Sequence, residues 1–349
     1  MSKIRIGIVG GGFNGQIGFI QNFDKNKYCK IYGLAEARTK LRKKLIKKFK
    51  IENSYSSHKD LIKDIKKYDG IAIITRRDMI GPLAFEFLKL GKPVLTEKPM
   101  AGNYDQAEKL LKCSKKYKTL YKIGYNKIYD EGIVKAKRVF DKIVKKKSLG
   151  KIVLIKLHRL SGSGYDNNNI YIKSSEKNYI SKPSWPIKPK WLPKRYKKSY
   201  EKYLNLYCHN VNLLRYFINE TPKILNTKLS DKTMSVVNLQ FRDYCAVLET
   251  GHFTKYGWDE TFEIYFELGC MKIFLPPQHY KNRSAYFEIY NRKSGKIIKF
   301  KSSKSWSFRN QCNAFIDDIS KKRININRAE DGLKDIKLIE DIWKNYINT

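Results

Sequence analysis

The chain has 349 residues, of which 42% are hydrophobic and 13% aromatic, a composition that excludes a disordered protein and favours two globular domains. Lysine and arginine outnumber aspartate and glutamate by 72 to 33, which gives a formal net charge of +39. The basic residues comprise 57 lysines and only 15 arginines, whereas proteins that read nucleic acids favour arginine. We therefore interpret the charge as solvated helix surface and expect no nucleic-acid partner.

We expect neither a membrane span nor a metal centre. No segment approaches the roughly 18 consecutive apolar residues of a spanning helix, and the first apolar run is too short for a signal peptide. The six cysteines include no CxxC pair, which argues against a structural zinc site and against a disulfide framework. These features predict a cytoplasmic protein with reduced thiols.

Residues 1–124 alternate predicted strands with predicted helices, a pattern typical of a doubly wound parallel sheet with helices on both faces. The predicted strands are 3–9, 30–35, 70–75, 93–96 and 120–125, and the predicted helices are 16–23, 41–49, 60–67, 80–89 and 104–117.

Residues 125–326 begin with a predicted helix at 132–146 and continue as long alternating runs with few helices, which predicts a large, mostly antiparallel open sheet. The runs are 151–159, 224–229, 235–241, 246–253, 261–267, 270–275, 285–291 and 296–300. Residues 327–349 are predicted as a C-terminal helix, with Asn327 and Glu330 spaced as in a capping box. The expected fold class is α/β, a Rossmann domain followed by an α+β domain.

A glycine motif, Gly10-Gly11-Gly12-Phe13-Asn14-Gly15, follows the first strand, and Glu36 ends the second strand 21 residues later. Gly10 permits the tight turn, Gly12 lets backbone N–H groups approach a pyrophosphate, and Gly15 lets the next helix pack closely. Since a carboxylate at Glu36 accepts ribose hydroxyls and repels a 2′-phosphate, NAD is the expected cofactor. Arg38 keeps NADP as an alternative, because it could accommodate that phosphate.

The sequence Thr96-Glu97-Lys98-Pro99 stands at the carboxyl end of a predicted parallel strand, where open α/β sheets bind ligands. Proline permits a cis peptide bond before it, which would aim Lys98 at the ligand. The alternative is an ordinary surface lysine.

A predicted helix at 204–219 carries Asn205, His209, Asn212 and Tyr216, spaced four, three and four residues apart. This spacing makes one polar stripe with apolar residues on both sides, which favours a cleft. The alternative is a core histidine that a neighbour satisfies.

Residues 162–193 are a polar predicted loop, too long for a simple connector, which we interpret as a lid or binding loop. The overlapping segment 188–202 (KPKWLPKRYKKSYEK) is basic with interleaved aromatic residues. It could clasp the diphosphate of a nucleotide sugar or form a solvated loop, and both readings stay open.

Taken in order, several segments make the chain resemble the Gfo/Idh/MocA family of oxidoreductases, which includes glucose-fructose oxidoreductase and inositol dehydrogenase. The segments are GGGFNG, YGLAEARTKLRKKL, IITRRDMIGPLAFEFLKLGKPVLTEKPMA, IGYNKIYD, HNVNLLRYF and GWDETFEIYFELG. The resemblance implies a Rossmann domain, an α/β domain with an open sheet, and homodimers or homotetramers built on that sheet. Family members act on sugars, inositols or nucleotide sugars with NAD or NADP.

The resemblance also implies roles for individual residues. Lys98 and His209 match the catalytic lysine and histidine, and Asn205 departs from the aspartate that many members have there. Substrate contacts are expected from Tyr125, Asn126, Asn205, Arg159 and Asn212, with Tyr256 and Trp258 as further candidates. Cofactor contacts are expected from Gly10, Gly12, Phe13, Asn14, Gly15, Glu36, Arg38, Thr75, Glu97 and Lys98.

The expected reaction moves a hydride between a carbinol of a sugar, inositol or nucleotide sugar and nicotinamide, with His209 as the general base. A glycosidase or lyase that recycles its bound NAD after transient oxidation is one alternative. A non-catalytic nucleotide-binding protein is another, because Asn205 lacks the charge of aspartate.

Overall fold

A computed structural model describes residues 2–162, 170–177, 185–230, 234–254, 257–322 and 329–348. The chain divides into two compact units, each of them discontinuous in sequence. Unit 1 comprises Met1–Tyr125, Asn169–Asn205 and Phe308–Lys337, and unit 2 comprises Asn126–Asn168, Leu206–Ser307 and Leu338–Thr349.

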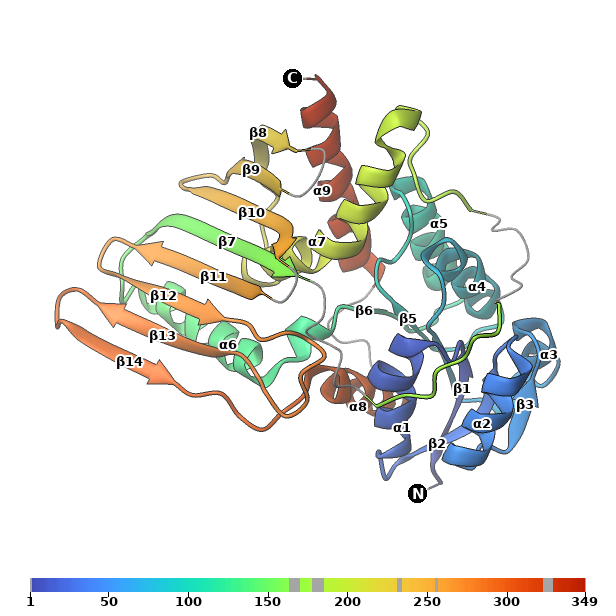
Figure 1. The fold of residues 1–349 in the computed structure, drawn as a ribbon. Helices are drawn as coiled ribbons and strands as arrows, with labels where there is room; N and C mark the ends of the chain where they lie inside the picture. Colours follow the sequence, from blue (N-terminus) through green and yellow to red (C-terminus); the bar gives the residue numbers. More distant parts are fainter. Residues whose placement is uncertain are drawn as a thin grey trace. The chain divides into compact units, whose positions relative to one another are not determined.

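Unit 1 is built on a six-stranded parallel sheet in the order β3-β2-β1-β4-β5-β6 (Figure 1). The order reverses between β1 and β4, the place where doubly wound sheets bind ligands. The strands are β1 (Ile4–Val9), β2 (Cys29–Ala35), β3 (Asn53–Tyr55), β4 (Gly70–Ile73), β5 (Val94–Glu97) and β6 (Tyr121–Gly124). The predicted doubly wound domain is confirmed.

The helices of unit 1 cover this sheet. A buried π-helical turn, Gly15–Ile20, leads from the glycine motif into the first of them. They are α1 (Gln21–Asp24), α2 (Thr39–Phe49), α3 (His58–Lys63), α4 (Arg77–Lys89), α5 (Tyr104–Lys116) and α8 (Ser307–Ser320), together with the first part of α7 (Lys197–Phe217) and of α9 (Ala329–Asn348).

Unit 2 is built on an eight-stranded sheet in the order β14-β13-β12-β11-β7-β10-β9-β8, antiparallel except for the parallel pair β10 and β7. Its strands are β7 (Ile152–Gly162), β8 (Lys223–Leu229), β9 (Met234–Gln240), β10 (Cys245–Thr254), β11 (Trp258–Phe266), β12 (Gly269–Phe274), β13 (Tyr286–Asn291) and β14 (Lys296–Phe300). The predicted mostly antiparallel sheet is confirmed.

Aromatic contacts join the helices of unit 2 to one face of this sheet. Phe140 of α6 (Glu131–Lys146) lies 5.6 Å from Phe217 of α7 and 6.4 Å from Phe266 of β11, between ring centroids. The opposite face carries ion pairs between neighbouring strands, such as Lys272–Glu263 and Lys299–Glu288. One face is therefore core, and the other combines charged side chains with aromatic ones such as the stacked pair Phe274 and Tyr286.

Two elements were not predicted. Strand β3 has only three residues, too few for the alternation of a strand to show. Helix α8 places Phe308 against Phe19 and Phe315 against Phe23, which attaches this late segment to the Rossmann sheet. The predicted domains 1–124, 125–326 and 327–349 were continuous, whereas unit 1 also takes in α8 and the segment Asn169–Asn205.

The structure also bears on the expectations for the cysteines, for membrane spans and for the cap of the C-terminal helix. The six cysteines form no disulfide with one another. None of the helices in the described ranges combines the length and the apolar run that crossing a bilayer needs. Asn327, proposed to cap the C-terminal helix, lies outside the described residues.

A buried ion pair between Lys122 of β6 and Asp318 of α8 generates a stability prediction, because both side chains are fully buried. Asp318→Ala removes one charge of this buried pair, so we expect a loss of about 3–5 kcal/mol in the free energy of unfolding, measured by urea denaturation. The double variant Lys122→Met/Asp318→Leu removes both charges and should recover most of the loss. Equal stability of Asp318→Ala and wild type would contradict this account.

Candidate functional site

A pocket of about 480 Å³ lies at the carboxyl ends of β1, β4 and β5 in unit 1. This volume is within the roughly 300–1,000 Å³ typical of ligand and cofactor sites. All ten residues predicted to contact a dinucleotide line it, and the pocket adds Ile74, Arg76, Arg77 and Asn205 to them.

The glycine motif forms one wall, and each glycine meets a different constraint. Gly10 has φ of +103°, and a Cβ there would lie 2.0 Å from the carbonyl oxygen of Ile74. A Cβ on Gly15 would lie 2.5 Å from the carbonyl oxygen of Gly10. A Cβ on Gly12 would meet only the Arg38 guanidinium, at 3.7 Å. The open space at Gly12 fits the close approach of backbone to pyrophosphate that this motif serves.

Glu36 directly follows β2, as predicted, but its carboxylate already has several protein donors. The Glu36 Oε2 accepts the Gly11 N–H at 2.8 Å and Arg38 Nη2 at 2.9 Å, and its Oε1 accepts Arg38 Nε at 2.8 Å and the Arg38 N–H at 3.0 Å. Burial raises the pKa of Glu36, but these donors outweigh burial and leave its pKa below the usual value. Arg38 therefore balances the charge that was expected to repel a 2′-phosphate.

Arg76 and Arg77 follow β4 and were not predicted as pocket residues. Arg76 forms an ion pair with Asp78 at 2.5 Å. A signal for both was present in the sequence, because they follow a buried parallel strand whose carboxyl end lies at the ligand-binding edge.

Lys98 enters the pocket from the carboxyl end of β5, and the Lys98–Pro99 peptide bond is cis. Its ammonium donates to the backbone oxygen of Asn205 at 2.7 Å and to Asn205 Oδ1 at 3.2 Å. Burial raises the pKa of the adjacent Glu97, and the charge of Lys98 opposes that rise. Asn205 thus supplies two acceptors to Lys98 without adding negative charge.

The predicted lid, residues 162–193, is described over 170–177 and 185–193. The first part, Ile170–Lys177, crosses the glycine-motif side of unit 1, where Tyr171 packs edge-on against Phe13 with ring centroids 4.9 Å apart. The second part packs on α4 and α5, where Trp185 lies against Phe85 and the Pro186 oxygen accepts from Gln106 at 2.7 Å. The basic segment 188–202 contains an internal hydrogen bond, in which Lys188 Nζ donates to the Leu192 backbone oxygen at 2.8 Å.

The remaining substrate candidates do not line this pocket, and most of them belong to unit 2. Tyr125 is buried just after β6, at the end of a segment of unit 1. Unit 2 holds four others, all buried: Asn126, Arg159, His209 and Asn212. Tyr256 lies outside the described residues.

Within unit 2, Arg159 of β7 donates to the Leu206 backbone oxygen, and its guanidinium lies 5.1 Å from the centroid of the Trp258 ring. Asn126 donates to Ser307 Oγ at 3.0 Å. These side chains fix α7 and the 126–129 turn within the unit, and their described contacts are internal.

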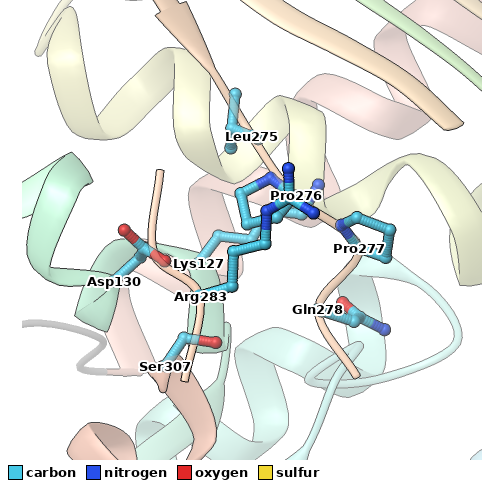
Figure 2. A pocket seen from close by; sticks show the side chains of 8 residues that line it. All are labelled: Lys127, Asp130, Leu275, Pro276, Pro277, Gln278, Arg283 and Ser307. Atoms are coloured by element: carbon cyan, nitrogen blue, oxygen red, sulfur yellow. The ribbon is translucent and has the colours of Figure 1, made fainter. Parts of the chain in front are cut away.

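Unit 2 contains a small cavity of about 10 Å³. Figure 2 shows side chains that line it, among them Lys127, Asp130, Arg283 and Ser307. This is room for about one water molecule. Burial lowers the pKa of Lys127 to about 8, although its ion pair with Glu260 opposes the shift. Burial raises the pKa of Asp130 to about 6, while its backbone N–H donors oppose the shift. The cavity is too small for a sugar.

The described residues contain no cluster of three or more His, Cys, Asp or Glu side chains arranged to hold a metal ion. The predicted cofactor residues line the pocket at the carboxyl ends of β1, β4 and β5, and a second pocket of unit 1, of about 620 Å³, contains none of them.

Comparison with known proteins agrees with this geometry. Residues 4–125 match the model of the Gfo/Idh/MocA family, described as an oxidoreductase family with an NAD-binding Rossmann fold. Myo-inositol 2-dehydrogenase of Thermotoga maritima is 23% identical over 138 residues, which span 40% of this chain and 41% of that enzyme.

Two solved structures share the fold over almost the whole chain. A 3-ketoreductase from Actinomadura kijaniata, in complex with NADP and TDP-benzene, has a TM-score of 0.77 and 15% identity, and the match covers 99% of this chain and 98% of that one. A putative myo-inositol dehydrogenase from Sinorhizobium meliloti has a TM-score of 0.72 and 17% identity, with the same coverage. The resemblance predicted from the sequence is confirmed, since residues 4–125 match the NAD-binding Rossmann model of the Gfo/Idh/MocA family.

Proposed function

We propose that the protein is an NAD-dependent oxidoreductase that acts on a carbinol of a sugar, an inositol or a nucleotide sugar. The observation that carries the proposal is the pocket at the carboxyl ends of β1, β4 and β5, whose lining includes the glycine motif, Glu36 after β2, and Lys98. The similarity to an inositol dehydrogenase and to the fold of a ketoreductase supports this substrate class.

The chain's residues have distinct proposed tasks. The N–H groups and open space at Gly12 receive the pyrophosphate, and the carboxyl end of β2 receives the adenosine ribose. A bound dinucleotide supplies the nicotinamide that exchanges a hydride with the carbinol carbon. Lys98, held by Asn205, donates a hydrogen bond to the reacting oxygen. His209 is proposed as the general base, on the resemblance and because imidazole titrates near neutral pH.

We further propose that copies of the chain associate through the face of the eight-stranded sheet opposite α6, as the resemblance implies. That face carries aromatic side chains, such as Phe274 and Tyr286, beside ion pairs between neighbouring strands. The proposed location is the cytoplasm.

Replacement of Gly12 tests the cofactor site separately from the fold. Gly12→Val places a side chain where the structure leaves space, so we expect the melting temperature to change little and the affinity for NAD to fall by at least about tenfold, measured by calorimetry. Gly10→Ala is the matched comparison, because its Cβ would collide with the Ile74 backbone and lower the melting temperature itself. Undiminished NAD binding by Gly12→Val would place the cofactor elsewhere.

A substrate panel tests the reaction. Sugars, inositols and nucleotide sugars are each supplied with NAD or NADP, and absorbance of the reduced cofactor is followed; we expect net accumulation with at least one substrate. Product formation without net reduced cofactor would indicate instead a glycosidase or lyase that recycles its NAD. Failure of wild-type protein to bind either dinucleotide would remove the whole proposal.

Variants of the two proposed catalytic residues are then assayed on the substrate that the panel identifies. Lys98→Met and His209→Ala should each lower kcat by about 10²–10⁴-fold, the usual contribution of a positioned proton donor or base, while NAD affinity stays near that of wild type. Unchanged turnover by His209→Ala would refute its assignment as the base. Unchanged turnover by Lys98→Met would do the same for the lysine.

A further inference from the structure

The segment Ile170–Lys177, here called the strap, is tied to the nucleotide-binding side of unit 1 along its length. Gln16, beside the glycine motif, forms a reciprocal pair of hydrogen bonds with the Ile172 backbone, at 2.8 and 3.0 Å. Gln21 Nε2 donates to the Ile170 oxygen at 3.2 Å, and Tyr171 packs on the pocket residue Phe13. Figure 1 shows the strap, in yellow-green, passing α1 towards α2.

The far end of the strap reaches the N-terminus of α2. Glu176 accepts the backbone N–H of Lys40 at 3.0 Å on Oε1 and that of Leu41 at 2.9 Å on Oε2. Ser174 Oγ donates to the same carboxylate at 3.2 Å. A residue 135 positions away along the chain therefore caps this helix.

The helix has no cap of its own. Its N-cap residue is Arg38, whose side chain makes no capping hydrogen bond, and its first turn contains no acidic residue. The first N–H groups of a helix lack intrahelical partners and carry partial positive charge, so they attract an anion. The Lys40 N–H holds the pKa of Glu176 below its usual value, against the effect of burial, and the Leu41 N–H acts in the same direction.

This capped end adjoins the part of the pocket where a 2′-phosphate would be distinguished from a hydroxyl. Arg38 is both the N-cap of α2 and a pocket residue, and it neutralises Glu36 through its hydrogen bonds. An arginine near the end of the second strand and the free N-terminus of a helix are both groups that bind phosphate. Because Arg38 neutralises Glu36, this carboxylate repels the 2′-phosphate of NADP only weakly.

We propose that Glu176 makes the pocket selective for NAD, because its carboxylate takes the anion position at the N-terminus of α2 that the 2′-phosphate of NADP would otherwise use. This inference rests on the proposed function. NAD has no phosphate at that position, so it binds with the strap in place. NADP must displace the carboxylate of Glu176 from the Lys40 and Leu41 N–H groups.

Two substitutions and a control test the proposal by calorimetry with NAD and NADP on the full chain. Glu176→Gln keeps the length of the side chain and removes its charge, and Glu176→Ala removes the cap. Glu108→Gln is the control, because it makes the same change in net charge on exposed α5, where Glu108 pairs with Lys112. In both Glu176 variants we expect the Kd for NADP to fall by about tenfold while the Kd for NAD changes by less than about threefold.

Hydrogen exchange of the segment 39–49 supplies a second readout. The Lys40 and Leu41 amides should exchange faster in Glu176→Ala than in wild type, and saturating NADP should restore their protection while NAD should not.

An unchanged ratio of NADP to NAD affinity in both Glu176 variants overturns the proposal, as does an equal change in Glu108→Gln. Failure of wild type to bind either dinucleotide is a different result, because it contradicts the proposed function and not the role of Glu176 alone.

Discussion

The parallel register of β1, β2, β4 and β5 is the constraint on which the candidate site depends. Parallel strands end at the same edge of a sheet, so residues far apart in sequence arrive together wherever those strands stop. The glycine motif, Glu36, Thr75 and Lys98 each follow a different strand, and all line one pocket. The close approach of Gly10 to the Ile74 carbonyl shows how tightly this edge is packed. A shift of any one strand would separate the set.

Acidic and basic side chains are paired in this pocket, although basic residues greatly outnumber acidic ones in the whole chain. The protein as a whole is strongly cationic, and helix surfaces such as that of α2 carry exposed lysines. In the pocket, each acidic side chain has a basic neighbour, since Glu36 binds Arg38 and Glu97 lies beside Lys98. Close pairing of opposite charges therefore shapes the local electrostatics of the pocket more than the net charge of the whole chain does.

The sequence was sufficient to predict the two sheets and the ten pocket residues, because both leave strong local signals. Alternating or continuous apolar runs mark strands, and a glycine motif after a strand has a known geometry. Helix α8 could have been predicted from the spacing of Phe308, Cys312 and Phe315, but its place on the Rossmann sheet could not. That attachment depends on which aromatic residues it meets, Phe19 and Phe23, and no local pattern encodes a contact almost 300 residues distant.

The contacts of the strap could not be predicted from the sequence either, because they also join residues far apart in the chain. A long polar loop predicts a lid only in general terms, and nothing near Glu176 in sequence indicates the N-terminus of α2. The sequence feature that indicates such a contact lies in α2, because its N-cap residue is Arg38 and its first turn contains no acidic residue. An uncapped helix start beside a ligand pocket requires an acceptor from elsewhere in the chain, or from the ligand.

Asparagine at position 205 has a physical consequence for the same pocket. An aspartate there would pair with Lys98 and cancel its charge, whereas the Asn205 amide and backbone oxygens hold the ammonium in place and leave its charge intact. The lining then has four cationic side chains, Arg38, Arg76, Arg77 and Lys98, against the two acids Glu36 and Glu97. A lining with this excess suits an anionic dinucleotide. It also makes the pocket as a whole favourable to one more phosphate, which is why the proposed selectivity for NAD depends on the carboxylate of Glu176 at the N-terminus of α2.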